Sequence, residues 1–312
     1  MVQMDPEHGR SVVCIGELLW DLLPTGPQLG GAPANVAVLA GALGDRAALV
    51  SRIGRDALGQ QAQETLQQRP VLLDHLSIDP EHATGSVSVH LDGAGVATYT
   101  IREDVAWDHL LMQPALQDLA RSADAVCFGT LAQRSVPTRA TLRAFVRQTT
   151  PACVRVFDVN LRPPYASAEV VLWGLEHATI LKMNHEEVHW IAECVGAPAL
   201  RGDAKLLARS LLAQFPIEVV AVTRGSQGCL LVTRQQSAEH PGTAVQVADT
   251  IGAGDAFTAA LTHFYLRQAP LSVLAEAGAR WGAWVATQTG GMPLVPKAVR
   301  DRIHAEITES LK

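Results

Sequence analysis

Residues 154–195 contain the pattern that decides the fold, VRVFDVNLRPPYASAEVVLWGLEHATILKMNHEEVHWIAECV. Two short apolar runs, at 154–158 and 180–183, predict buried strands, and residues 169–177 and 186–195 have the spacing of helices. A strand, a helix and a second strand in this order are typical of a parallel pair joined by a crossover helix. The stretch therefore predicts an α/β protein with a mostly parallel sheet covered by helices on both faces.

The same alternation continues on both sides of this stretch. Apolar runs and helical spacing predict strands at 12–15, 47–50, 125–128 and 219–223 and helices at 36–43, 57–68, 138–148, 203–214, 272–287 and 296–310. Two hairpins interrupt the alternation. We expect one at 84–91 and 96–101 with a turn at 92–95, and another at 228–232 and 244–247. The first hairpin predicts a small accessory sheet whose apolar face needs a cover.

Composition limits the classes of protein and of partner. The chain has 312 residues, of which 48% are hydrophobic, and its formal net charge is −6. This balance, without a run of Lys and Arg, argues against nucleic acid or a membrane surface as a partner. The cysteines are odd in number (five), scattered and without a C-x-x-C pair, which favours reduced thiols and a cytoplasmic location.

A glycine turn at 249–257, DTIGAGDAF, leads into an apolar helical run. Gly252 and Gly254 allow a ligand to approach the backbone, and the free N–H groups of a first helical turn attract anions. A carboxylate beside a phosphate repels it unless the acid has a proton to take, so Asp255 is a candidate base for phosphoryl transfer. The alternative is that Asp255 only caps the helix.

Polar residues follow the predicted strands at the edge of the sheet where ligands bind in open α/β folds. This group comprises Asp21, Asn160, Arg162, Asn184, Glu187, Thr223, Gly225 and Gly228. Structural explanations exist for several of them. Asn184 and Glu187 have the spacing of a capping box, and residues 223–228 could be a plain turn.

Other chemistries are tested by their motifs. Residues 185–189 read HEEVH, which on a helix could hold zinc in a hydrolase. Ala192 stands where the extended zinc-protease pattern requires glycine, which disfavours this alternative. No G-x-x-x-x-G-K-[ST] loop is present, and residues 252–257 lack the third small residue of a dinucleotide-binding turn.

From end to end, the chain resembles the ribokinase-like (PfkB-type) sugar kinases. Residues 30–37, GGAPANVA, are similar to the N-terminal motif of that family, and residues 249–257 to its C-terminal motif. Between them, Asn184-x-x-Glu187 and Thr223-x-Gly225-x-x-Gly228 resemble its magnesium/phosphate and ATP-loop motifs, in the same order. The resemblance implies a three-layer sandwich formed by a single domain over residues 1–312. It also implies a small antiparallel β lid, formed by about 84–102 and part of the segment 17–30.

The resemblance also implies roles for individual residues. Asp255 would be the base, and the backbone of Gly252, Ala253 and Gly254 would form an anion hole. Sugar hydroxyls would be held by Asp21, Gly30, Gly31, Asn35 and Asp255. Mg²⁺ would be held through water by Glu187 and Asn184, and the ATP site would be lined by Asn184, Thr223, Gly225, Gly228, Gly252 and Gly254.

Finer features look most like fructokinases. These are residues 16–21 (GELLWD), the 160–162 segment and Arg102, with Asn160 and Arg102 expected at the sugar and Arg162 at the transferring phosphoryl group. D-Fructose is therefore the first expected substrate, and 2-keto-3-deoxygluconate kinase and ribokinase remain alternatives. Many relatives also hold K⁺, here near Asp249 and the 286–291 loop, and dimerise through the lid. Trp107 and residues 129–133 are expected to shape the pocket.

Overall fold

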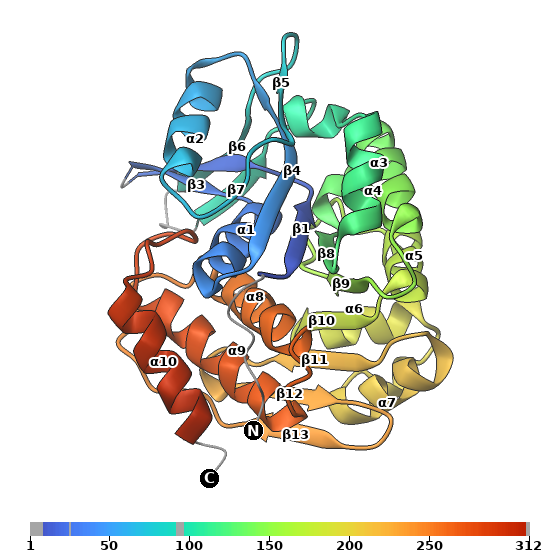
Figure 1. Ribbon diagram of the computed structural model, residues 1–312. Coiled ribbons are helices and arrows are strands. Elements are labelled where there is room, and N and C mark those ends of the chain that lie inside the picture. The colour runs from blue at the N-terminus through green and yellow to red at the C-terminus, as the bar shows by residue number, and fades with distance from the viewer. Residues whose placement is uncertain (1–8, 25, 92–96, 310–312) are drawn as a thin grey trace.

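The computed structural model describes residues 9–24, 26–91 and 97–309. Its centre is a nine-stranded sheet in the order β13-β12-β11-β10-β9-β8-β1-β4-β5 (Figure 1). Neighbouring strands are parallel from β11 to β5, whereas β12 is antiparallel to β11 and β13 is antiparallel to β12. The strands are β1 (Ser11–Ile15), β4 (Arg46–Gly54), β5 (Leu76–Asp79), β8 (Ala125–Gly129), β9 (Val154–Asp158), β10 (Ile180–Asn184), β11 (Val219–Thr223), β12 (Cys229–Val232) and β13 (Ser237–His240).

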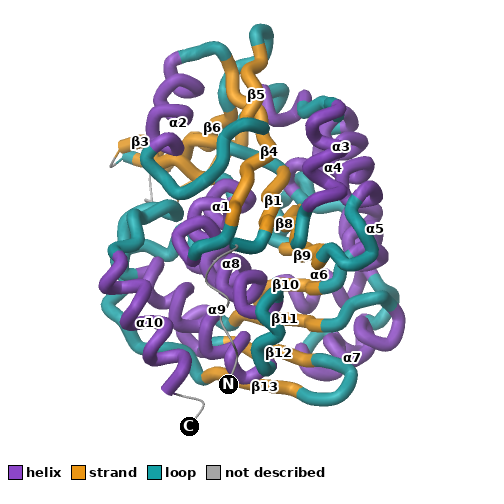
Figure 2. The backbone as a smooth tube through the Cα atoms, in the orientation of Figure 1, coloured by secondary structure: helices purple, strands orange, loops and turns teal. Residues whose placement is uncertain are grey.

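Helices cover both faces of this sheet, which confirms the predicted α/β architecture (Figures 1 and 2). One core lies under α1 (Ala32–Leu43), α2 (Ala57–Gln67), α8 (Ala253–Tyr265), α9 (Leu271–Ala286) and α10 (Lys297–Glu309). The other lies under α3 (Pro114–Ser122), α4 (Val136–Gln148), α5 (Ala168–His177), α6 (Glu187–Cys194) and α7 (Ala204–Gln214). In β1, Val12 and Cys14 enter the first core and Val13 and Ile15 the second, as the two-residue period of a strand requires.

A second, four-stranded sheet has the order β3-β2-β6-β7. It contains β2 (Leu19–Leu23), β3 (Gly26–Gly30), β6 (Gly85–Leu91) and β7 (Ala97–Ile101). The β2–β3 and β6–β7 pairs are antiparallel and β2 and β6 are parallel, so the small sheet is mostly antiparallel, as predicted, with one parallel pair. The two hairpins are separated by α1, β4, α2 and β5, and this long connection allows β6 to run in the same direction as β2.

Contacts attach this small sheet to the main domain. Trp20 donates its indole N–H to the carbonyl of Leu58 in α2 (3.0 Å). A satellite core joins Leu19 and Val87 of the small sheet to Trp107 and Leu131. Trp107 is therefore a packing residue at the base of the small sheet. The turn expected at 92–95 lies outside the described residues.

The last predicted hairpin is wrong in its second strand. β12 pairs with β13 (Ser237–His240), not with residues 244–247. β13 is a polar edge strand with alternating half-buried and exposed side chains, so it lacks the apolar signal of a buried strand. Val245 and Val247, which carried that signal, are exposed. None of the helices described is both long and apolar enough to cross a membrane.

Candidate active site

A cavity of about 580 Å³ opens where the carboxyl ends of the parallel strands meet the small sheet. Its walls come from β2, the start of α1, the ends of β8 to β11 and the first turn of α8. Ten of the predicted site residues line it, namely Asp21, Gly31, Asn35, Asn160, Arg162, Asn184, Thr223, Gly252, Gly254 and Asp255. Segments far apart in the chain thus form one site.

The first turn of α8 faces this cavity. Gly252 precedes the helix with a left-handed φ of 77°, and a Cβ there would lie 2.4 Å from the Cα of Gly291. Only glycine fits this position. The carboxylate of Asp255 does not cap α8; it accepts a 2.7 Å hydrogen bond from the side-chain amide of Asn35 in α1. The helix end therefore remains available to an anion.

Asp255 has the protonation chemistry of a general base. Its side chain is buried, with the residue only 8% exposed. Burial, and after it the negative charge of Asp158, raises the pKa of Asp255 to about 6, while Lys182 and the bond from Asn35 act in the opposite direction. A carboxylate with this pKa is mostly ionised at neutral pH and still accepts a proton readily.

A buried ion pair beneath the α8 turn was not predicted from the sequence. The ammonium group of Lys182 donates to Oδ1 of Asp158 (3.0 Å), whose Oδ2 accepts from the hydroxyl of Thr258 (2.9 Å). A Cβ on Gly254 would come within 3.1 Å of the Lys182 nitrogen. All four residues line the cavity, so this pair places a fixed cation directly behind the glycine turn. The available signal was a lysine and an aspartate inside otherwise apolar strands.

Asn184 and Glu187 form the capping box proposed as their structural explanation. The Asn184 side chain accepts from the backbone N–H groups of Glu186 and Glu187 (both 2.9 Å), and Oε2 of Glu187 accepts from the N–H of Asn184 (2.8 Å). Oε1 of Glu187 accepts from the N–H of Leu161 (2.7 Å). The box therefore also fixes the 160–162 loop, which carries Arg162. Asn184 lines the cavity, whereas Glu187 lies behind it.

Two more acidic side chains, Glu17 and Asp21, line the cavity near the small sheet. Burial raises the pKa of Asp21, on β2, to about 6 and that of Glu17 to about 7, and the charge of Arg162 opposes both shifts. Glu17 was not among the predicted site residues, although it belongs to the quoted 16–21 segment. One of its carboxylate oxygens is buried without a hydrogen-bond partner, which is costly unless a ligand donates to it.

The other predicted residues lie outside the cavity lining. They are Gly30, Arg102, Glu187, Gly225, Gly228, Asp249 and Ala253. Arg102 is exposed, and the Asp249 carboxylate accepts from the N–H groups of Ile251 (2.9 Å) and Gly290 (3.2 Å). From the 129–133 segment, Gly129, Thr130 and Leu131 do line the cavity.

The zinc-hydrolase alternative is wrong. Helix α6 is bounded by Glu187 and Cys194, so His185 lies before it, and within the described ranges His185 and His189 belong to no group of three potential metal ligands. The glutamate that would act as base, Glu186 or Glu187, is either exposed or engaged in the capping box. Within the described ranges, a group of three potential metal ligands occurs elsewhere, at His82, Asp104 and His109.

The residues that line the cavity fit a nucleoside triphosphate with Mg²⁺. A helix N-terminus and the Lys182 ammonium suit phosphate oxygens. The Asn184 and Asp158 oxygens already accept hydrogen bonds within the protein, which fits contact with Mg²⁺ through the water ligands that this ion usually keeps. The oxygens of Glu187 are both engaged, so any role of this residue toward a cation runs through water.

Comparisons with known proteins agree with this geometry. Residues 11–298 match the pfkB family of carbohydrate kinases. A fructokinase of Salmonella typhimurium is 32% identical over 259 residues, which cover 79% of this chain and 81% of the relative. The structure of a Vibrio cholerae fructokinase with fructose, ADP and calcium superposes with a TM-score of 0.80 at 27% identity, covering 96% of this chain and 99% of that one.

Two further structures contain ligands of interest. A Pyrococcus horikoshii sugar kinase in complex with ATP has a TM-score of 0.78 at 27% identity and covers 95% of this chain and 99% of its own. A double mutant of the Vibrio cholerae fructokinase, with fructose, ADP and potassium, has a TM-score of 0.80 at 27% identity. The superposition covers 95% of this chain and 98% of that one.

Proposed function

Because the chain belongs to the pfkB family of carbohydrate kinases, which are ATP-dependent phosphotransferases, we propose that its substrate is a small sugar, first of all D-fructose. The observation that carries this proposal is the placement of Asp255. Its carboxylate, whose pKa is raised to about 6, lies in the first turn of α8. The cavity around it is also lined by polar side chains that can bind sugar hydroxyls. The names of the relatives at about 30% identity add support for fructose.

In the proposed reaction, Asp255 takes the proton of the sugar hydroxyl. The hydroxyl oxygen forms a bond to the γ-phosphorus as the bond from that phosphorus to the β,γ-bridging oxygen breaks, giving a sugar phosphate and ADP. The captured proton is then released to solvent. The N–H groups of the 252–254 turn and the Lys182 ammonium behind them stabilise charge on the phosphoryl oxygens.

The remaining groups hold the two substrates. Asp21, Asn35, Asn160 and the backbone at Gly30 and Gly31 would bind sugar hydroxyls, and Arg162 would bind the transferring phosphoryl group. Thr223 and the turn at 225–228 would face the nucleotide. Mg²⁺ bound with ATP would neutralise charge between the β- and γ-phosphates, with Asn184 and Glu187 contacting its water ligands.

Three accessory features complete the proposal. The small sheet would act as a lid that excludes water from the cavity. Its outer face would pair with a second copy of the chain. The loop that Asp249 ties to Gly290 would hold K⁺.

A coupled ADP-release assay tests the proposal with fructose, tagatose, ribose, 2-keto-3-deoxygluconate and adenosine. Fructose should give the highest kcat/KM, and preferred turnover of another sugar would replace fructose as the substrate. Asp255→Asn should lower kcat by about 10²- to 10⁴-fold while ATP binding stays measurable. Turnover of none of the five compounds would contradict the assignment of a small-sugar substrate.

A further inference from the structure

Three side chains outside the active-site cavity converge at the base of the small sheet. They are His82, Asp104 and His109, and one ligand atom of each lies within 4.8 Å of the others. Nε2 of His109 is 2.8 Å from Oδ1 of Asp104, and Nε2 of His82 is 3.8 Å from the same oxygen. We propose that these residues form a binding site for one divalent transition-metal ion, with Zn²⁺ as the reference ligand.

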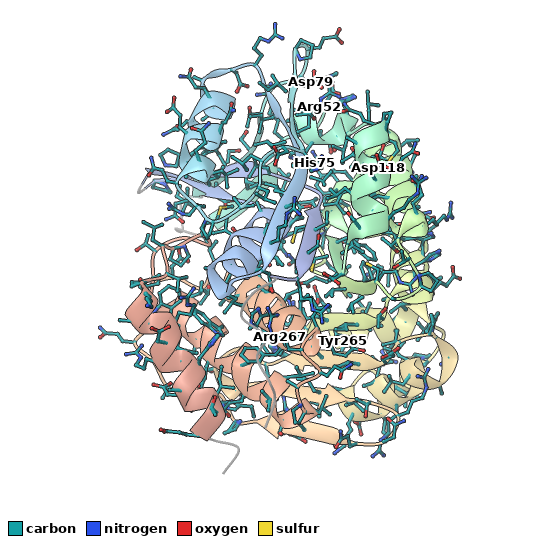
Figure 3. The ribbon with its side chains drawn as sticks, viewed as in Figure 1. Arg52, His75, Asp79, Asp118, Tyr265 and Arg267 are labelled. Atoms are coloured by element: carbon teal, nitrogen blue, oxygen red, sulfur yellow. The ribbon has the colours of Figure 1, made fainter. Side chains whose placement is uncertain are left out.

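The orientation of His82 is fixed by a buried carboxylate. Nδ1 of His82 is 3.1 Å from Oδ2 of Asp79, and Oδ1 of Asp79 accepts from the N–H groups of Glu81 (2.8 Å) and His82 (3.0 Å). Arg52 pairs with the same carboxylate at 3.1 Å (Figure 3 labels Arg52 and Asp79). An ionised carboxylate only accepts hydrogen bonds. The neutral His82 ring must therefore carry its proton on Nδ1.

This tautomer leaves a bare lone pair on Nε2 of His82, directed toward the carboxylate of Asp104. Two acceptors then face each other at 3.8 Å, although the Asp104 oxygen is also 2.8 Å from Nε2 of His109. A cation placed there would satisfy both. An imidazole whose second nitrogen donates to a carboxylate is the usual arrangement around protein-bound metals, because the carboxylate orients the ring and increases its basicity.

The set of donors selects the kind of ion. Two imidazoles and one carboxylate are a ligand set that zinc uses with water in its fourth position. Mg²⁺ and Ca²⁺ prefer oxygen ligands only, so the magnesium of a kinase assay would not compete strongly. The two rings are stacked, with centroids 3.5 Å apart. They would have to tilt apart for both Nε2 atoms to reach one ion, which would also replace the Asp104–His109 hydrogen bond.

The position of the cluster means that a bound ion would link separate segments of the chain. His82 lies in the connection that leads into β6, Asp104 follows β7, and His109 ends the short helix η1 (Ala106–His109). Both connections of the β6–β7 hairpin therefore meet η1 at this cluster. A bound ion would tie the hairpin to the main domain, and we expect it to slow local opening there. This inference does not depend on which sugar the protein uses.

Isothermal titration of the full chain with Zn²⁺, without nucleotide or Mg²⁺, tests the site directly. One ion per chain should bind, and His82→Ala and His109→Ala should each weaken binding by at least about tenfold. Asp104→Asn, at a side chain that is 78% exposed, gives a third variant with little effect on packing. Equal thermal unfolding midpoints in EDTA would show that the variants fold as the parent does.

Two controls separate this site from other possible ligands. Zinc binding should be unchanged in the double variant His185→Ala/His189→Ala, which removes the exposed HEEVH histidines, and in Cys194→Ser, at a half-buried thiol. Hydrogen exchange at residues 102–109 should slow on addition of Zn²⁺ in the parent only. Absence of stoichiometric Zn²⁺ binding, or binding that survives in His82→Ala and His109→Ala, would overturn the proposal.

Discussion

The pH dependence of turnover should follow the ionisation of Asp255. The base must be deprotonated to act, so kcat/KM falls as pH drops through its pKa of about 6. Near pH 7 about nine-tenths of Asp255 is ionised, and near pH 5 about one-tenth, so we expect roughly a tenfold loss between these values.

Two substitutions in the buried ion pair should move this fall of kcat/KM, the acid limb of the pH profile, in opposite directions. Burial is the largest cause of the raised pKa of Asp255, but Asp158 raises it further and Lys182 lowers it. Lys182→Met removes the cation and should shift the acid limb to higher pH. Asp158→Asn removes the anion and should shift the limb to lower pH. A change of one pKa unit corresponds to about 1.4 kcal/mol between the protonation states.

The measurement is kcat/KM by coupled ADP release between about pH 4.5 and 8.5, with the sugar and ATP each varied in turn. Glu17→Gln is the control, because burial raises the pKa of Glu17 to about 7 and this group could contribute to the same limb. The limb should persist in Glu17→Gln. A limb that moves in the same direction in both Lys182→Met and Asp158→Asn, or in neither, would refute the assignment of Asp255 as the base.

Three further predictions concern stability and are measured by urea unfolding. Because the pKa of Asp255 rises from 3.8 to about 6 on folding, the parent loses stability as pH rises through this window. Asp255→Asn should therefore be more stable near pH 8 by up to about 3 kcal/mol, and an equal gain near pH 4 would contradict this. Gly252→Ala should cost about 1–3 kcal/mol or more, and clearly more than Gly196→Ala, since Gly196 has a similar φ of 69° but open space around it. Glu187→Gln should cost about 1–3 kcal/mol, because an amide N–H would face one of the two backbone donors; an unchanged unfolding midpoint would count against the capping box.

The sequence predicted the central architecture because the parallel strands are buried on both faces. Runs such as 125–128 and 219–222 are apolar throughout, which is the pattern of such strands. Helix α3 (Pro114–Ser122) and strand β13 were missed for the opposite reason. Only Leu116 and Ala120 are buried in α3, and β13 has no fully buried side chain, so few apolar residues mark either element in the sequence.

The candidate site was predictable where a residue type has few alternatives and unpredictable where pairing in space decides. Gly252 and Asp255 stand out because a glycine turn followed by an acid has a limited set of explanations. Lys182 and Asp158 are 24 residues apart and meet only because β9 and β10 are adjacent in the sheet. Asp158 ends β9 and Lys182 lies in the middle of β10, and spacing along the chain cannot reveal their contact.

The charges of the cavity explain why buried cations matter at this site. Its lining contains four carboxylates, on Glu17, Asp21, Asp158 and Asp255, against two cations, on Lys182 and Arg162. ATP adds further negative charge to an already acidic cavity, so the carboxylates near it would be repelled or protonated if no cation intervened. Lys182 holds Asp158 in an ion pair and so removes that carboxylate from the repulsion, while the 252–254 turn offers its N–H groups. The same balance would make binding of ATP depend on a divalent cation more than the direct contacts alone suggest, because that cation must offset the carboxylates as well as the phosphates.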